Sequence, residues 1–181
     1  MLRIYLTDLA AYNSGYLIGE WISLPVDADE LRAALSSVLK NGQHVCKDNL
    51  PHEEYFITDS EWSDTELFEI GEYEDVFSLN DQLNLLDEEG LTEYELKAIG
   101  FLLTNGFSDS LEEAIDKKDE VVIYENSSMS DIAYDYVHEC YDLENLPPLI
   151  SSNIDFDAVG RELEMDGSFF HERNDIYEYR N

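Results

Sequence analysis

The chain combines an extreme negative charge with a composition that can still form a packed core. It contains 42 Asp and Glu residues against 10 Lys and Arg residues, which gives a formal net charge of −32 over 181 residues. Hydrophobic residues nevertheless make up 44% of the chain and aromatic residues 12%, whereas disordered acidic chains are poor in both aromatic and β-branched residues. We therefore predict a folded protein whose length fits one medium domain or several small ones.

The charge excludes two classes of binding partner. Nucleic acids are bound through Lys and Arg clustered on phosphates, and anionic membranes attract basic segments, so this chain would repel both. No apolar run approaches the roughly 18 residues of a membrane span, and the N-terminus lacks a signal-peptide pattern. With only two cysteines, Cys46 and Cys140, the sequence predicts a cytoplasmic, reduced protein that binds a basic surface or a cation.

The charge is concentrated in the middle third of the chain. Residues 1–60 carry a net charge of −5, residues 61–120 carry −16 and residues 121–181 carry −11. We predict that a functional acidic surface is formed by the acidic residues of the middle third, hereafter the acidic set. Its members are Glu61, Asp64, Glu66, Glu69, Glu72, Glu74, Asp75, Asp81, Asp87, Glu88, Glu89, Glu93, Glu95, Asp109, Glu112, Glu113, Asp116, Asp119 and Glu120.

Hydrophobic patterns predict an α+β fold in which the first domain, residues 1–69, holds a three-stranded sheet and a helix. The expected strands lie at residues 3–7, 16–24 and 55–58. Asp27 is a suitable N-cap, with Glu30 three residues further on, and Asn41-Gly42 is expected to end the helix.

The second predicted domain, residues 70–118, consists of short helices. One has its apolar stripe at Leu79, Leu83 and Leu86, and the next begins at a capping-box pattern of Thr92 and Glu95.

The third domain, residues 119–181, returns to mixed structure. Its expected elements are a strand at 120–125, a helix with Ile132, Ala133, Tyr136, Val137 and Cys140 on one face, a helix at 155–165, and closing strands at 168–171 and 176–179.

Two patterns that resemble metal sites are weak. The pairs His44-Val45-Cys46 and His138-Glu139-Cys140 have a shorter gap than structural zinc sites use, and the second lies in a predicted helix, where residues two apart point to different faces. The segment 162–173 loosely matches a calcium-binding loop with Gly167 at position six, but Arg173 stands where a bidentate Glu is needed. We predict no metal site.

No motif indicates catalysis. The chain contains no nucleophile elbow, no phosphate-binding loop and no dinucleotide-binding fingerprint. Its carboxylates are so numerous that no pair stands out as the two acids of a glycosidase. The sequence therefore predicts a protein that is not an enzyme, with no catalytic residues and no cofactor.

The collective charge has two explanations. Adaptation to high salt would spread acidic residues evenly, which the concentration in residues 61–120 does not favour. Imitation of nucleic acid is the sharper explanation, since B-DNA carries about one charge per 1.7 Å, so that −32 equals the phosphate charge of roughly 16 base pairs. Rows of carboxylates on short helices would present a DNA-binding groove with the charge pattern that it binds.

Three ordered segments resemble the ArdA antirestriction protein family. The first comprises I-Y-L at residues 4–6 and Y-N-S-G-Y-L-I-G-E-W at residues 12–21, followed by Leu24-Pro25. The second is F-L-L at residues 101–103 with S-L-E-E-A at residues 110–114, and the third is N-I-D-F-D-A-V-G-R-E-L at residues 153–163. A longer segment at residues 41–49, which contains His and Cys, departs from the family pattern.

The resemblance implies an elongated, curved chain of three small domains that imitates DNA. Such proteins form homodimers and occupy the DNA-binding groove of type I restriction–modification enzymes, so that incoming mobile DNA escapes cleavage. They are not enzymes and need no cofactor. The dimer contact is expected near Tyr124 to Tyr136. The alternative is an acidic decoy or chaperone for basic DNA-binding proteins in general.

Overall fold

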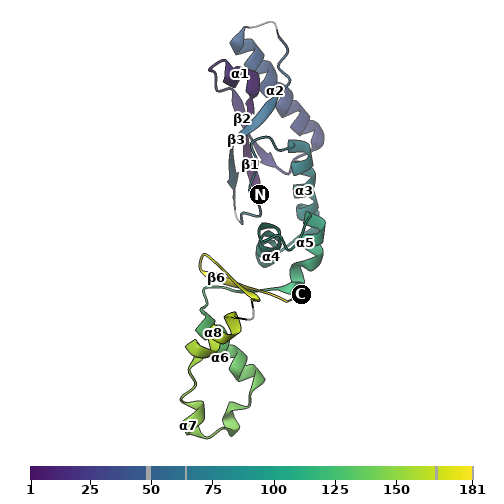
Figure 1. Ribbon diagram of the computed structural model, residues 1–181. Coiled ribbons are helices and arrows are strands. Elements are labelled where there is room, and N and C mark those ends of the chain that lie inside the picture. Colours follow the sequence, from purple (N-terminus) through teal and green to yellow (C-terminus); the bar gives the residue numbers. More distant parts are fainter. Residues whose placement is uncertain (48–49, 64, 166, 181) are drawn as a thin grey trace. The chain divides into compact units, whose positions relative to one another are not determined.

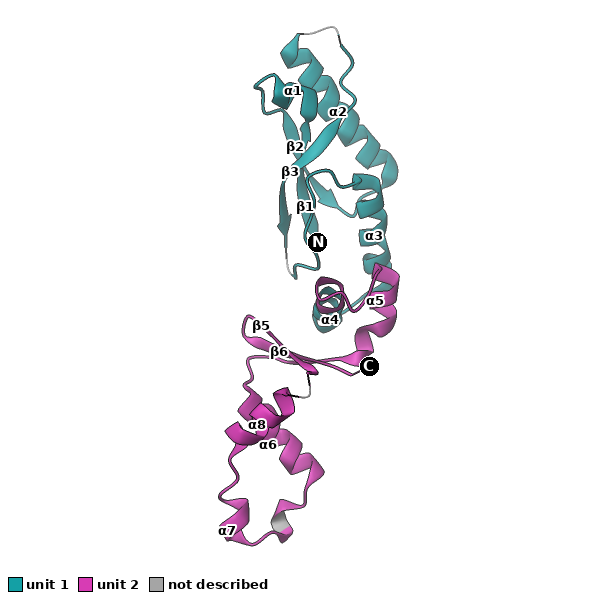
Figure 2. Cartoon of the chain, viewed as in Figure 1, with its two compact units in different colours: residues 1–100 teal, residues 101–181 magenta. Residues whose placement is uncertain are grey.

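The computed structural model describes residues 1–47, 50–63, 65–165 and 167–180. It is a mixed α/β protein with two three-stranded antiparallel sheets, which confirms the mixed character of the predicted fold. The chain divides into two compact units, residues 1–100 and residues 101–181 (Figure 2). The division into three domains at the boundaries given above stays a prediction.

The first unit is built on a sheet with strand order β2-β1-β3 (Figure 1). Its strands are β1 (Leu2–Asp8), β2 (Gly19–Leu24) and β3 (Tyr55–Trp62). Leu2, Ile4 and Leu6 of the central strand are completely buried, as the two-residue period of a strand with one face on a core requires. The long helix α2 (Ala28–Cys46) contacts β1 and β2. All three predicted strands are present, although β2 begins later and β3 ends later than expected.

Helix α2 continues through Gly42, so the prediction that Asn41-Gly42 ends it was wrong. Gly42 is buried inside the helix and lies directly against the carboxylate of Asp8, where any side chain would collide with that group. The glycine therefore permits close packing instead of stopping the helix. The helix ends at Lys47, which adopts the left-handed conformation with a φ of 54°.

Two further helices follow the sheet, α3 (Val76–Glu89) and α4 (Glu93–Thr104). The predicted stripe of leucines on α3 is buried, and the helix ends at Gly90 in the left-handed conformation. The capping box at the start of α4 is confirmed. Glu95 Oε2 accepts the backbone N–H of Thr92 at 2.8 Å, and Thr92 Oγ1 accepts that of Glu95 at 3.3 Å.

The second unit contains a sheet with strand order β4-β6-β5 and several short helices. Its elements are α5 (Leu111–Lys117), η1 (Lys118–Glu120), β4 (Val121–Tyr124), α6 (Met129–Cys140), η2 (Leu143–Asn145), α7 (Pro148–Ser151), α8 (Phe156–Glu164), β5 (Phe169–Glu172) and β6 (Asp175–Tyr179). The ring of Phe101 stacks on that of Tyr177 with centroids 4.8 Å apart. This stack anchors the sheet to the last turns of α4.

Helix α6 buries a narrower face than the sequence predicted. Ile132, Ala133 and Val137 are buried, but Tyr136 and Cys140 are exposed. Helix α8 packs against α6, and Gly160 of α8 lies so close to the backbone of Met129 that a larger residue would collide with it. The ring of Phe156 on α8 also contacts Tyr134 and His138 of α6, whereas residues 138–140 stay exposed.

Candidate functional site

The acidic set lies almost entirely on the surface of the described residues. Asp64 lies outside the described part of the chain. All other members are exposed except Glu95, Glu113 and Glu120, which are half-buried. The members up to Glu95 belong to the first unit and those from Asp109 onward to the second. That these residues form a binding surface stays a prediction.

Some members of the set have a structural role. Asp75 caps α3 by accepting the backbone N–H of Phe77 at 2.9 Å, and Glu61 pairs with Arg3 at 3.3 Å. Glu113 accepts a hydrogen bond from Lys117 at 2.7 Å. This bond, followed by one from the backbone N–H of Asp109, lowers the pKa of the Glu113 carboxyl. The negative charge of these residues is therefore partly compensated by hydrogen bonds and ion pairs within the chain.

Ten other members of the set have no partner among the described residues. Their side chains make no hydrogen bond and no ion pair with the described part of the chain. They are Glu69, Glu72, Asp81, Asp87, Glu88, Glu89, Asp109, Glu112, Asp116 and Asp119. A carboxylate without its own counter-charge is available to a cationic group of another molecule.

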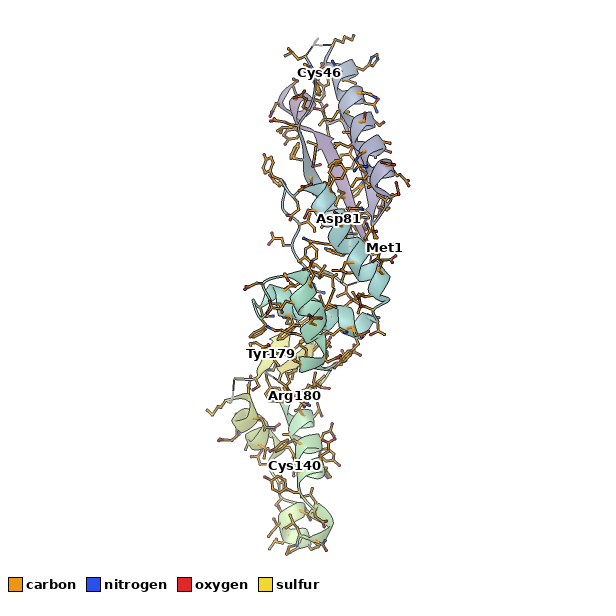
Figure 3. All side chains as sticks on the ribbon, turned by 90° about the vertical axis from the view of Figure 1, so that its right-hand side faces the viewer. Met1, Cys46, Asp81, Cys140, Tyr179 and Arg180 are labelled. Carbon is orange, nitrogen blue, oxygen red and sulfur yellow. The ribbon has the colours of Figure 1, made fainter. Side chains whose placement is uncertain are left out.

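Three carboxylates converge on one open hollow of about 540 Å³, which is lined by Asp27, Asp81 and Glu88 among other residues. The side chain of Asn80 holds the two sides of this hollow together. Its amide donates to the backbone carbonyl of Val26 and its oxygen accepts the N–H of the same residue, both at 2.9 Å. These two bonds tie α3, on which Figure 3 marks Asp81, to the start of α2, where Asp27 is the N-cap.

Asp27 is a member of this hollow that sequence analysis missed. The sequence marks it only as a helix cap, and Asn80, which brings α3 to it, lies 54 positions away from Val26. No local pattern links positions so far apart. The contact depends on tertiary packing alone.

Sequence analysis also missed a buried pair of titratable residues. His52 Nδ1 lies 2.6 Å from Asp8 Oδ2, and the two side chains are 1% and 0% exposed. The other carboxylate oxygen of Asp8 accepts the backbone N–H of Ala11 at 2.9 Å, so Asp8 also caps helix α1 (Leu9–Asn13). The pair joins the end of β1 to the segment before β3 and is structural, because solvent does not reach it.

The candidate metal ligands seen in the sequence are not gathered into one site within the described residues. Within residues 1–47, 50–63, 65–165 and 167–180, no three His, Cys, Asp or Glu side chains are placed to share a metal ion. Asp166, which belongs to the segment 162–173 with its loose match to a calcium-binding loop, lies outside these ranges. Cys46 and Cys140 are free thiols. What the arrangement offers is many exposed negative charges, which suit a multivalent cationic partner.

None of the helices in the described ranges is both long enough and apolar enough to cross a bilayer. The scaffold and its exposed carboxylates define the class: a strongly acidic protein of mixed α/β structure. The family model of the antirestriction protein ArdA matches residues 4–178. The chain therefore belongs to the ArdA antirestriction protein family, which confirms the resemblance seen in the sequence. Its function is antirestriction, and the family acts by inhibition and not by catalysis. No curated protein matches the chain in a sequence search.

Proposed function

We propose that this protein inhibits type I restriction–modification enzymes by imitating DNA. It occupies the groove in which the enzyme binds DNA, so that incoming DNA escapes cleavage. One observation carries the proposal: half of the net charge of −32 lies in residues 61–120, where most of the carboxylates are exposed and about half have no partner among the residues that the structure describes.

The spacing of carboxylates on α3 supports this proposal. Asp81 and Glu88 are seven positions apart, so they lie on the same face of the helix. Seven residues rise about 10 Å along a helix axis at roughly 1.5 Å per residue. Successive phosphates of one DNA strand are about 3.4 Å apart along the duplex axis, so the two carboxylates match the rise of roughly three base pairs. Lys and Arg side chains that bind phosphates at that interval can bind these carboxylates instead.

Competition with DNA tests the proposal. Increasing amounts of the protein should displace a labelled DNA duplex from a type I enzyme until one equivalent of protein leaves no DNA bound. Displacement occurs because both ligands need the same basic groove. If the enzyme still binds its DNA fully at stoichiometric protein and low salt, the proposal is wrong.

The complex should weaken steeply with salt. Exposed charges are screened over about 10 Å at 0.1 M salt, and proteins that bind DNA through several phosphates lose orders of magnitude in affinity between about 50 and 200 mM salt. We expect the dissociation constant of the inhibitor–enzyme complex to rise at least tenfold over the same range. Isothermal titration calorimetry at four salt concentrations measures it, and a constant affinity would indicate apolar recognition.

A control distinguishes the proposed target from a general decoy. The same titration against an unrelated basic DNA-packaging protein should give much weaker binding, because a decoy needs only opposite charge whereas a mimic needs matching geometry. Equal affinities for the two proteins would favour the alternative of an acidic decoy or chaperone.

The proposal includes a homodimer with its contact on α6, within the expected region from Tyr124 to Tyr136. The hydroxyl of Tyr124 donates to Glu178 at 2.8 Å. Burial, followed by this bond, raises the pKa of Tyr124 to about 12. Its polar end is thus engaged within the unit. Tyr134 and Tyr136 are 49% and 43% exposed, so they are better suited to contact a second chain.

Replacing Tyr136 by Ser should weaken the dimer about tenfold, because a tyrosine at the centre of an interface commonly contributes roughly 1–2 kcal/mol. Sedimentation equilibrium measures the change. Tyr94→Ser is the matched control, since Tyr94 is also 43% exposed but lies on α4. Equal dissociation constants for both variants would place the contact elsewhere.

A further inference from the structure

The first unit contains a second hollow, of about 170 Å³, that has a different character from the acidic one. Its walls are largely apolar and include Trp62 of β3, Leu83 and Leu86 of α3, and Leu96 of α4. A cavity of roughly 150 Å³ is large enough to hold benzene. The hollow, which has the labelled Met1 on its wall (Figure 3), therefore has room for one side chain of a partner.

One carboxylate belongs to this largely apolar lining. Asp87 lines the hollow and is exposed, and its side chain makes no hydrogen bond or ion pair with the described residues. An apolar wall suits the aliphatic stem of a long side chain, and an indole ring attracts a cation over its face. A carboxylate beside them suits a guanidinium, which can donate two hydrogen bonds to it.

The same chain already combines an indole and a carboxylate around an arginine. The guanidinium of Arg3 lies over the ring of Trp21, 5.0 Å from its centroid, and pairs with Glu61 at 3.3 Å. On the surface of the first unit's sheet an arginine is thus held between an indole ring and a carboxylate. In the 170 Å³ hollow the tryptophan and the carboxylate are present, but no guanidinium of the described residues pairs with Asp87.

We infer that the hollow between Trp62 and Asp87 is a receptor for one arginine side chain of the partner. The stem lies against the leucines, and the guanidinium lies against the indole ring and pairs with Asp87. A phosphate-binding groove supplies arginines, so this inference rests on the proposed function and deepens it. The site differs from the rest of the acidic set because it also recognises the shape of the side chain.

Titration of the isolated protein with N-acetyl-argininamide tests the site directly. In two-dimensional NMR spectra, the indole N–H signal of Trp62 should shift in a saturable manner, while that of Trp21, which already holds Arg3, should not. Asp87→Asn should weaken the binding about tenfold or more, because a charge-assisted pair is lost. Asp81→Asn is the matched control: it removes another exposed carboxylate of α3, which does not line this hollow, and should leave the binding of the arginine probe at Trp62 unchanged.

Two neutral probes define the outcomes that would overturn the inference. N-acetyl-citrullinamide has nearly the same shape as the arginine probe but no charge, and N-acetyl-leucinamide is apolar. If either shifts the Trp62 signal as strongly as the arginine probe, the hollow is not an arginine receptor. The inference also fails if the arginine probe gives no saturable shift, or if Asp87→Asn binds it as well as the unaltered protein does.

An inhibition assay separates this inference from the proposed function. Against a type I enzyme, Asp87→Asn should raise the concentration needed for half-inhibition several-fold more than Asp81→Asn does. If the unaltered protein does not inhibit, the proposed function fails, while the arginine titration still decides the nature of the hollow. If it inhibits and the two variants are equal, only the arginine receptor is wrong.

Discussion

Neutralising six exposed carboxylates together should weaken inhibition of a type I enzyme by roughly tenfold to ten-thousandfold. The variant combines Asp→Asn and Glu→Gln at positions that have no internal partner, namely Asp81, Glu88, Glu89, Glu112, Asp116 and Asp119. Each exposed charge contributes only about 0.2–1 kcal/mol to an ion pair, so single substitutions should change the inhibition constant by less than about fivefold. Six such losses amount to roughly 1–6 kcal/mol, with a tenfold change in affinity for each 1.4 kcal/mol.

A charge-preserving variant is the matched control. Exchanging Asp for Glu and Glu for Asp at the same six positions keeps the net charge and should keep most of the inhibition. The neutralised variant should also melt at a higher temperature than the unaltered protein, because self-repulsion is reduced, which excludes unfolding as the cause of lost activity. If a single one of the six substitutions abolished inhibition, a specific site would have to replace the proposed collective surface.

Replacing His52 by Leu should destabilise the fold by about 3–5 kcal/mol, the usual cost of removing one partner of a buried pair. The variant leaves the carboxylate of Asp8 fully buried, with the N–H of Ala11 as its remaining hydrogen-bond donor from α1. Total stabilities of domains are commonly about 5–15 kcal/mol, so this is a large fraction. Urea unfolding followed by circular dichroism measures the loss.

His44→Leu provides the reference, because His44 is exposed on α2 and its replacement should change the free energy of unfolding by less than about 0.5 kcal/mol. A third variant tests the cause. Adding Asp8→Asn to His52→Leu removes the buried charge but keeps an oxygen to cap α1, so part of the lost stability should return. If His52→Leu were as stable as His44→Leu, the pair would not support the fold.

Local signals in the sequence predicted most of the secondary structure. The strands around Ile4 and Ile22 and the helix that begins after Thr92 follow from side-chain period and capping chemistry, which act over a few residues. The predictions that failed depend on contacts distant in sequence. Gly42 looked like a helix stop, but it is a glycine because Asp8 packs against it. The exposed position of Tyr136 depends on how α8 crosses α6.

The sequence identified the acidic residues of the candidate site, but it could not show how they are arranged in space. The concentration of charge in residues 61–120 identified the carboxylates, since charged side chains are rarely buried without partners. It could not identify the hollow of Asp27, Asp81 and Glu88, because the bonds of Asn80 that form it join α3 to a distant segment. The concentration of charge also could not distinguish Asp87 from the other acidic residues, because its neighbours in the 170 Å³ hollow come from three different elements.

Several acidic residues cap helices, and these tolerate different substitutions from the acidic residues that do not. Asp75 and Asp155 each accept a backbone N–H at the start of a helix, where Ser or Asn would serve equally well. Such positions can lose their charge during sequence drift while the helix keeps its first turn. An unpaired carboxylate on the exposed face of a helix is constrained differently. It can alternate between Asp and Glu, but a neutral residue there would remove negative charge from the acidic surface. Two members of the family can therefore differ by a few units of net charge and still present similar patterns to a partner, provided that the differences fall at the caps.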